Sequence, residues 1–201
     1  MHTALVIVDV QESFRQRPLW RTASNPDIVA DVNRLVGAAR ARHELVIWVL
    51  HAEAGSGDVF DPASGHVRPM DGLDPQDGEL ILTKTAHNAF TTTNLQQNLV
   101  SRGIGHVILC GIRTEQCVET TARLASDLGY EVTFVTEATV TFPTPHWTTP
   151  DLSVDELLAD PRTLPVEAII ARTEYALAGR FATIATVADV VGASREVLTG
   201  S

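Results

Sequence analysis

The sequence predicts an α/β fold: a three-layer α/β/α sandwich around a doubly wound, mostly parallel sheet of six strands. Two observations support this class. Short apolar runs without polar alternation, such as residues 3–10 and 45–50, are typical of strands buried on both faces of a parallel sheet. Segments with apolar residues at helical spacing separate these runs, and such alternation implies right-handed crossovers. Because no low-complexity tract divides the 201 residues, we expect a single domain over residues 1–201.

The individual elements follow from apolar periodicity and from local start and stop signals. Asn25 and Pro26 favour the start of the first helix, while Gly103 and Gly129 favour helix ends. The expected strands are residues 3–10, 45–50, 79–84, 106–112, 131–136 and 181–187, and the expected helices are 26–43, 93–102, 115–129, 166–178 and a short stretch at 153–159. The long segments 52–78 and 137–164 are expected to be loops, and substrate choice depends on them.

Three residues with reactive or charged side chains fall where expected strands end. Asp9 ends the first strand, Lys84 ends the third, and Cys117 lies in the first turn of the helix after the fourth. With a strand order of 3-2-1-4-5-6, the crevice of the sheet opens above the first and fourth strands. Each residue also has an ordinary alternative: a loop cap, a lysine that reaches solvent, or a small buried thiol. Their joint occurrence favours a hydrolytic set of nucleophile, carboxylate and cation.

The two cysteines are expected to differ in reactivity. Cys117 is predicted at a helix N-terminus, where free N–H groups and the macrodipole favour a thiolate, as does Lys84. The Asp9 carboxylate opposes ionisation and can take the proton, so the pair should titrate jointly. Cys110 ends a buried strand and should be shielded. We therefore expect alkylation to label Cys117 first.

Composition excludes several classes of function. The net charge of −10 and the lack of a clustered Lys/Arg stripe argue against nucleic acid as a partner. No apolar run approaches the length of a membrane span, and the N-terminus enters a strand without a basic leader. Two cysteines cannot form a secreted disulfide framework, so we expect a cytoplasmic protein. A Gly-x-Gly-x-x-Gly motif is missing after the first strand, which argues against nucleotide-dependent oxidoreduction.

Three motifs together resemble the isochorismatase-like cysteine hydrolase superfamily. They are Val8-Asp9-Val-Gln11-x-x-Phe14, Thr83-Lys84-x-x-x-x-Ala89-Phe90 and Gly111-Ile-x-Thr114-x-x-Cys117-Val-x-x-Thr121-Ala-Arg123. The resemblance covers residues 4 to about 190. The family includes nicotinamidases, N-carbamoylsarcosine amidases, ureidoacrylate and biuret hydrolases, and isochorismatases.

The resemblance implies a catalytic triad. Cys117 would attack a carbonyl carbon, Asp9 would accept its proton, and Lys84 would hold the pair by charge, so that an acyl-enzyme thioester forms. A cis peptide before Arg113 is usual in the family, and the Arg113 and Cys117 N–H groups would bind the oxyanion. Isochorismatases that cleave a vinyl ether lack the cysteine, so Cys117 favours hydrolysis of C–N bonds in a small amide, carbamoyl or ureido compound. A non-catalytic member that binds a metabolite or partner, and a vinyl-ether hydrolase, are the alternatives.

Nicotinamidases hold a metal with an Asp-x-His motif and a second histidine. Here the corresponding stretch is His51-Ala-Glu53, with His66 later, which departs from that motif. We expect no metal and no cofactor, while a zinc site made from these three side chains stays an open alternative.

Substrate contacts are expected from residues that border the crevice: Gln11, Phe14, Arg113, His146 and Trp147. Arginines beside the site of an acidic protein, among them Arg15, Arg17, Arg68 and Arg113, suggest recognition of a carboxylate, although solvated rim charges explain them equally well. The substrate is a small molecule that the sequence does not name. Family habit and the prevalence of two-fold symmetry favour a homo-oligomer, a dimer or higher.

Overall fold

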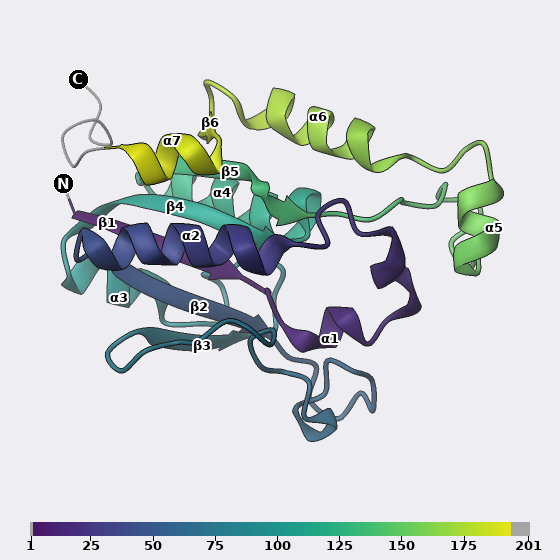
Figure 1. The fold of residues 1–201 in the computed structure, drawn as a ribbon, viewed down its shortest axis with the longest axis horizontal. Coiled ribbons are helices and arrows are strands. Elements are labelled where there is room, and N and C mark those ends of the chain that lie inside the picture. Colours follow the sequence, from purple (N-terminus) through teal and green to yellow (C-terminus); the bar gives the residue numbers. More distant parts are fainter. Residues whose placement is uncertain (1, 194–201) are drawn as a thin grey trace.

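The computed structural model describes residues 2–193 and contains one six-stranded sheet (Figure 1). The strands are β1 (His2–Val8), β2 (Leu45–His51), β3 (Leu80–Lys84), β4 (Ile104–Ile112), β5 (Glu131–Val140) and β6 (Thr183–Ala185). Their order is β3-β2-β1-β4-β5-β6, and every pair of neighbours is parallel. The predicted fold class and strand order are therefore confirmed.

Helices cover both faces of the sheet. They are α1 (Glu12–Arg15), α2 (Ile28–Ala41), α3 (Leu95–Ser101), α4 (Glu119–Asp127), α5 (Val154–Ala159), α6 (Val166–Leu177) and α7 (Val187–Gly192). Short 3-10 helices occupy Pro18–Thr22 and Pro62–Ser64, and Thr114–Val118 forms a π-helical turn, η3. One layer is formed by α2 and α7, and the other by α3, α4 and the end of α6.

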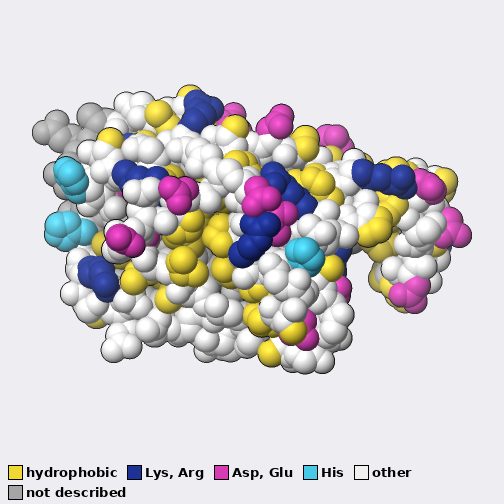
Figure 2. Space-filling view, turned by 60° about the horizontal axis from the view of Figure 1, so that its bottom comes forward, with side chains coloured by type: hydrophobic (Ala, Val, Ile, Leu, Met, Phe, Trp, Pro, Cys, Tyr) yellow, Lys and Arg dark blue, Asp and Glu magenta, His cyan; other side chains and the backbone are white. Residues whose placement is uncertain are grey.

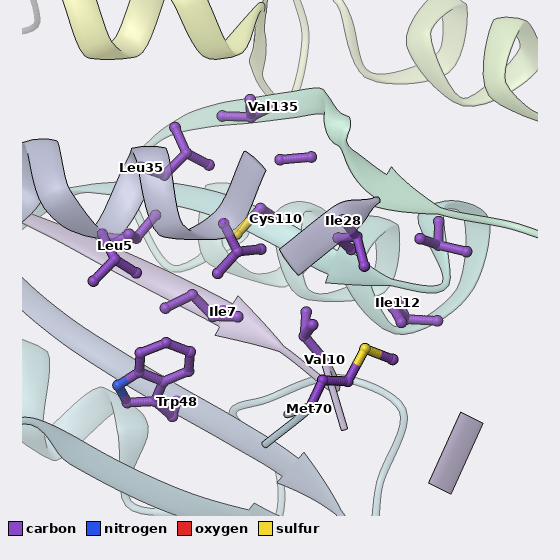
Figure 3. Close-up of a cluster of buried hydrophobic side chains, with 14 of the residues drawn as sticks. Leu5, Ile7, Val10, Ile28, Leu35, Trp48, Met70, Cys110, Ile112 and Val135 are labelled. Carbon is purple, nitrogen blue, oxygen red and sulfur yellow. The ribbon is translucent and has the colours of Figure 1, made fainter. Parts of the chain in front are cut away.

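Alternate residues of each central strand pack into opposite layers. Leu5 and Ile7 of β1 lie in the core under α2, together with Cys110 of β4 (Figure 3). Val6 and Val8 of β1 belong to the opposite core, which α3 and α4 cover. Because both faces are buried, the strands are continuous apolar runs, as parallel sheets require. The core therefore fixes the carboxyl ends of the strands, from which the candidate site is built.

Two strand predictions need correction at their ends. β5 continues to Val140 because a register shift between Leu109 and Gly111 restores its pairing with β4. The expected last strand, 181–187, is only Thr183–Ala185, since α7 begins at Val187. Thr186 and Asp189 form a capping box that starts α7. This helix-start signal was overlooked because the β-branched valines of α7 favour a strand. The fold thus ends with a helix that the periodicity alone did not predict.

The segment between β5 and α6 projects from the sheet as an arm, defined here as residues 143–165 (Figure 1). An antiparallel bridge between Thr144 and Leu164 joins its two sides, and α5 lies near its tip. Figure 2 shows the arm extending beyond the rest of the surface. Trp147 on the arm is 82% exposed. The prediction of a loop excursion with a short helix is confirmed for residues 143–165.

Across residues 2–193, every helix is too short or too polar to cross a bilayer.

Candidate active site

Asp9, Lys84 and Cys117 meet at the carboxyl edge of the sheet. The Lys84 ammonium Nζ lies 2.8 Å from Asp9 Oδ2 and 3.5 Å from Cys117 Sγ. Asp9 and Lys84 are 1% and 0% exposed, whereas Cys117 is 8% exposed. Asp9 follows β1, Lys84 ends β3 and Cys117 lies in η3 after β4, so three strand ends supply one cluster. The structure brings together the three residues that the strand-end argument singled out.

Local backbone geometry makes room for this cluster. Asp9 has a positive φ of 56° while its N–H still donates to the Val49 carbonyl at 2.8 Å, so the chain turns without leaving the ladder. Gly111 has a φ of 130°, and a Cβ placed there would lie 1.9 Å from the Val8 carbonyl oxygen. Only glycine permits β4 to pass so close to the end of β1. The close approach places the turn that carries Cys117 beside Asp9.

The turn that carries Cys117 is π-helical and precedes α4, which corrects the expected α-helix from residue 115. π-Helical turns often occur at functional sites. Thr121 Oγ1 donates to the Cys117 carbonyl at 2.6 Å and accepts from the Ala89 N–H at 3.1 Å. Thr114 Oγ1 lies 2.7 Å from Thr139 Oγ1. These hydroxyls tie the turn to the loop after β3 and to β5, so the position of Cys117 is fixed from two sides.

The peptide bond between Ile112 and Arg113 is cis, as the resemblance implied. Arg113 accepts hydrogen bonds at its carbonyl from the Gln116 and Val118 N–H groups, both at 3.2 Å. Within residues 2–193, the Arg113 N–H donates to no protein acceptor. This N–H is therefore available to a ligand at the start of η3.

Burial determines the protonation state of the Cys117 thiol. Burial, followed by the Asp9 carboxylate, raises the pKa of the Cys117 thiol to about 12, and Lys84 offsets this only in part. Burial also raises the pKa of Asp9 above its ordinary value, while Lys84 opposes the rise. Desolvation therefore outweighs the helix terminus and Lys84, which were expected to favour a thiolate, and the Asp9 carboxylate opposes ionisation as expected. The cluster holds a neutral thiol beside a carboxylate–ammonium pair.

A second set of contacts surrounds Lys84. The His51 ring nitrogen Nδ1 lies 3.3 Å from Lys84 Nζ, and Nε2 lies 3.1 Å from Glu53 Oε1. The Gln11 side chain accepts from the His51 N–H at 2.7 Å and donates to the His51 carbonyl at 3.0 Å. From the sequence, Gln11 was predicted to contact the substrate, and His51 was predicted to be a structural residue or a metal ligand. His51 and Lys84 are the last residues of the neighbouring strands β2 and β3 and lie opposite each other in the register. These two strand ends are the signal from which their contact could have been predicted.

The metal alternative involved His51, Glu53 and His66. Among residues 2–193, no group of three or more histidine, cysteine, aspartate or glutamate side chains has a metal-binding arrangement. His51 and Glu53 are joined to each other, while the backbone carbonyl of His66 accepts from Ser13 Oγ at 3.0 Å. The described residues therefore offer no ready metal centre.

Aromatic rings lead from His51 toward Arg113, and we call Phe60, Phe14 and Phe142 the aromatic wall. Ring centroids lie 5.8 Å apart for His51 and Phe60, 5.0 Å for Phe60 and Phe14, and 6.2 Å for Phe14 and Phe142. The Arg113 guanidinium carbon lies 4.8 Å from the Phe142 centroid. Phe14 and Arg113, two of the predicted substrate contacts, thus belong to one group of packed rings that begins beside Lys84, and its three phenylalanines are buried.

His146 and Trp147, the other predicted contacts, lie on the arm. Their rings are 5.4 Å apart, and His146 Nδ1 is 2.8 Å from Thr148 Oγ1. Among the described residues, neither side chain forms a hydrogen bond or ion pair with Asp9, Lys84 or Cys117. Their part in substrate binding stays a prediction.

Comparison with known proteins identifies the family of the chain. The Isochorismatase domain family matches residues 3–151. The chain is 30% identical to the isochorismatase family protein YrdC of Bacillus subtilis over 139 residues, which cover 69% of this chain and 74% of that protein. It is 28% identical to the ureidoacrylate amidohydrolase RutB of Klebsiella pneumoniae over 155 residues, 60% of this chain and 66% of that protein. The crystal structure of an isochorismatase from Pseudomonas putida is similar at a TM-score of 0.80 and 31% identity, covering 94% of this chain and 89% of that chain. The chain therefore belongs to the isochorismatase family of hydrolases.

Proposed function

We propose that the protein is a cysteine-dependent hydrolase of C–N bonds in a small amide, carbamoyl or ureido compound. The observation that carries the proposal is the contact of one buried ammonium, Lys84 Nζ, with both the Asp9 carboxylate and the Cys117 sulfur. A nucleophile, a proton acceptor and a charge that holds them together are the parts that acyl transfer requires. The name of RutB, an amidohydrolase, supports the same class of reaction.

In the proposed reaction, attack and deprotonation occur together. Asp9 Oδ1 is buried and has no hydrogen-bond partner among residues 2–193, so it is free to take a proton. As Cys117 Sγ bonds to the substrate carbonyl carbon, its proton passes to Asp9. The C–N bond then breaks, the proton moves to the leaving nitrogen, and a thioester remains. Because burial and Asp9 raise the pKa of the Cys117 thiol, the proton passes to Asp9 as the sulfur attacks.

The second half of the reaction returns the enzyme to its starting state. Asp9 removes a proton from water, the water oxygen attacks the thioester carbon, and the C–S bond breaks. The sulfur takes up the proton from Asp9, and the product acid is released. The N–H groups of Arg113 and Cys117 are proposed to stabilise the oxyanion in both halves, and one such donor is worth about 3 kcal/mol in other enzymes. Lys84 keeps Asp9 ionised between turnovers.

His51 is proposed to position Lys84. If His51 Nδ1 accepts from the ammonium, Nε2 carries the hydrogen that Glu53 accepts, and one tautomer satisfies both contacts. Gln11 holds the His51 backbone in place. The Lys84 ammonium thus has three directed neighbours: Asp9, Cys117 and His51.

The vinyl-ether reaction is the second candidate, because the Pseudomonas putida relative is named an isochorismatase. A test should compare ammonia release from a panel of small amides, ureas and carbamoyl compounds with cleavage of isochorismate. We expect ammonia from at least one panel member with the native enzyme and none with Cys117→Ala. Cleavage of isochorismate by both proteins, without ammonia release from any panel member, would support the vinyl-ether alternative. No turnover of any compound would favour a binding protein.

We also propose that the protein forms a homo-oligomer, with a two-fold dimer as the simplest case. The arm presents exposed apolar side chains, among them Trp147, Leu158 and Leu164, and closed two-fold assemblies are the commonest. Light scattering at micromolar concentration should give at least twice the monomer mass of 21.7 kDa. A mass of one chain would contradict this. The cytoplasmic location and the lack of a cofactor also stay predictions.

A further inference from the structure

The Arg113 guanidinium differs from the other arginines that the sequence placed near the site. Three of those arginines have a carboxylate partner in the same chain: Arg15 with Glu12 at 3.1 Å, Arg17 with Asp58 at 2.5 Å and Arg68 with Asp71 at 2.6 Å. Among residues 2–193, the Arg113 guanidinium forms neither an ion pair nor a hydrogen bond, and its carbon lies 4.8 Å from the centroid of the Phe142 ring. A partly buried charge without a partner is unfavourable, so this group is suited to receive an anion.

The environment of Arg113 strengthens this point. Burial lowers its pKa below the ordinary value, and the nearby Arg17 charge lowers it further. Glu115 is close enough to raise the pKa, but it forms no ion pair with Arg113. Instead, Glu115 Oε2 accepts from Thr141 Oγ1 at 2.6 Å. The guanidinium therefore stays desolvated and without a hydrogen-bonded counter-ion.

Arg113 also lies at a useful place relative to the nucleophile. It precedes η3, four residues before Cys117, and the two side chains are close enough to interact electrostatically. Packed rings join the two regions: His51 beside Lys84 contacts Phe60 of the aromatic wall, and Phe142 of the same wall lies beside the guanidinium. A ligand bound at Cys117 would therefore lie close to a fixed positive charge.

We propose that Arg113 binds a carboxylate of the substrate, so that the enzyme acts on small amide, carbamoyl or ureido acids. This inference rests on the proposed function. The planar guanidinium binds a carboxylate through two parallel hydrogen bonds. Arg17 provides a contrast, since it lies 4.8 Å from the Phe60 ring of the same wall but is already paired with Asp58.

The first test needs no substrate and uses two alkylating reagents of similar size. Iodoacetate carries a carboxylate, whereas iodoacetamide is neutral, and both react with thiols. The rate with iodoacetate divided by the rate with iodoacetamide is measured at Cys117 and then divided by the same ratio for free cysteine. This normalised ratio reports how strongly the site attracts an anion. Arg113→Met should lower this normalised ratio about tenfold, because it removes the unpaired cation. Arg17→Met removes the same formal charge from the same wall and should change the ratio by less than about twofold.

Arg113→Lys keeps the charge but loses the planar fork, so its ratio should lie between the native and Arg113→Met values. Thermal unfolding of each variant identifies any protein that has lost its fold, and Arg113→Lys serves if Arg113→Met does not fold. The inference is overturned if the ratio falls equally in Arg113→Met and Arg17→Met, or if Arg113 replacements leave it at the native value.

The second test uses turnover of ureidoacrylate and of the matching carboxamide. For the acid, Arg113→Met should raise KM about 10- to 100-fold, and the preference of the enzyme for the acid over the neutral analogue should fall by about the same factor. Equal turnover of the acid and the carboxamide by the native enzyme would overturn the inference and leave the proposed function intact. Loss of the anion preference in Arg113→Met, in a protein that hydrolyses no amide, would support the anion site and contradict the proposed function.

Discussion

Cys110 and Cys117 are seven residues apart and lie on opposite faces of the sheet, and both thiols have a pKa raised to about 12. The causes differ. Burial alone raises the pKa of Cys110, which is fully enclosed under α2. Burial and the Asp9 carboxylate together raise the pKa of Cys117, which retains 8% exposure and a contact with Lys84. The comparison teaches that the same raised pKa can have different causes, and that of the two thiols only Cys117 has a neighbouring carboxylate and partial exposure.

Removing each thiol in turn should give the largest contrast. We expect Cys117→Ala to lower kcat/KM for an ammonia-releasing substrate by at least about 10⁴-fold, because no other group can form the thioester. Cys110→Ala should retain activity within about twofold and lose about 1 kcal/mol of unfolding free energy to a small core cavity. Steady-state kinetics and urea unfolding measure the two effects. Equal losses of activity would show that Cys117 has no special role.

The next largest effect concerns Asp9, the neighbour that Cys110 lacks. Asp9→Asn removes the proton acceptor and should lower kcat by about 10²- to 10⁴-fold. In the native enzyme the acceptor is the ionised carboxylate, so activity is present above the Asp9 pKa and is lost as pH falls through it. Because burial raises that pKa, the acidic limb of kcat/KM should lie above the ordinary value of 3.8. An acidic limb at or below 3.8, or a fully active Asp9→Asn variant, would contradict this assignment.

A smaller effect is expected from His51, which touches the cluster only through Lys84. His51→Ala should lower kcat about tenfold with little change in KM, because Lys84 loses an acceptor that orients it. Asparagine places its side-chain oxygen near the Nδ1 position, so His51→Asn should recover most of the loss. Glutamine reaches the Nε2 position instead and should not recover it. The same activity in the alanine, asparagine and glutamine variants would rule out a positioning role.

The smallest expected effect is that of chelators. If the chemistry of Cys117 depends on Asp9 and Lys84 without a metal, exhaustive treatment with EDTA should leave turnover within about 20% of the untreated value. Metal analysis of the purified protein should find no stoichiometric zinc. Activity that disappears on chelation and returns with Zn²⁺ would instead support a zinc site made from His51, Glu53 and His66.

Much of the fold could be predicted because buried parallel strands are continuous apolar runs, and the rules of crossover handedness leave few strand orders. The meeting of Asp9, Lys84 and Cys117 followed from the same reasoning, since carboxyl ends of parallel strands share one edge. The extension of β5 depended on a register shift, which single-strand periodicity does not reveal. α7 was missed because its valines favour a strand more strongly than the Thr186 cap favours a helix.

Details of the site were less predictable because they depend on burial and on distant pairs. The charge state of Cys117 required its desolvation to be known, and a sequence displays the helix terminus and the lysine but not the exposed fraction. Gln11 is polar and close to the triad in sequence, yet its amide holds the backbone of His51, forty residues away. The sequence does not show which arginines are paired: in the described residues Arg15, Arg17 and Arg68 each have a carboxylate partner, and Arg113 has none.

The most direct test of the account is competitive alkylation of the two cysteines in the native enzyme, followed by peptide mass mapping and residual activity. At neutral pH, iodoacetamide should label Cys117 at least about tenfold faster than Cys110, because only Cys117 has access and a neighbouring base. Activity should fall in proportion to Cys117 labelling, and the Asp9→Asn variant should lose most of the rate difference. Equal labelling of both cysteines, or full activity after complete modification of Cys117, would contradict the claim that Cys117 is the nucleophile.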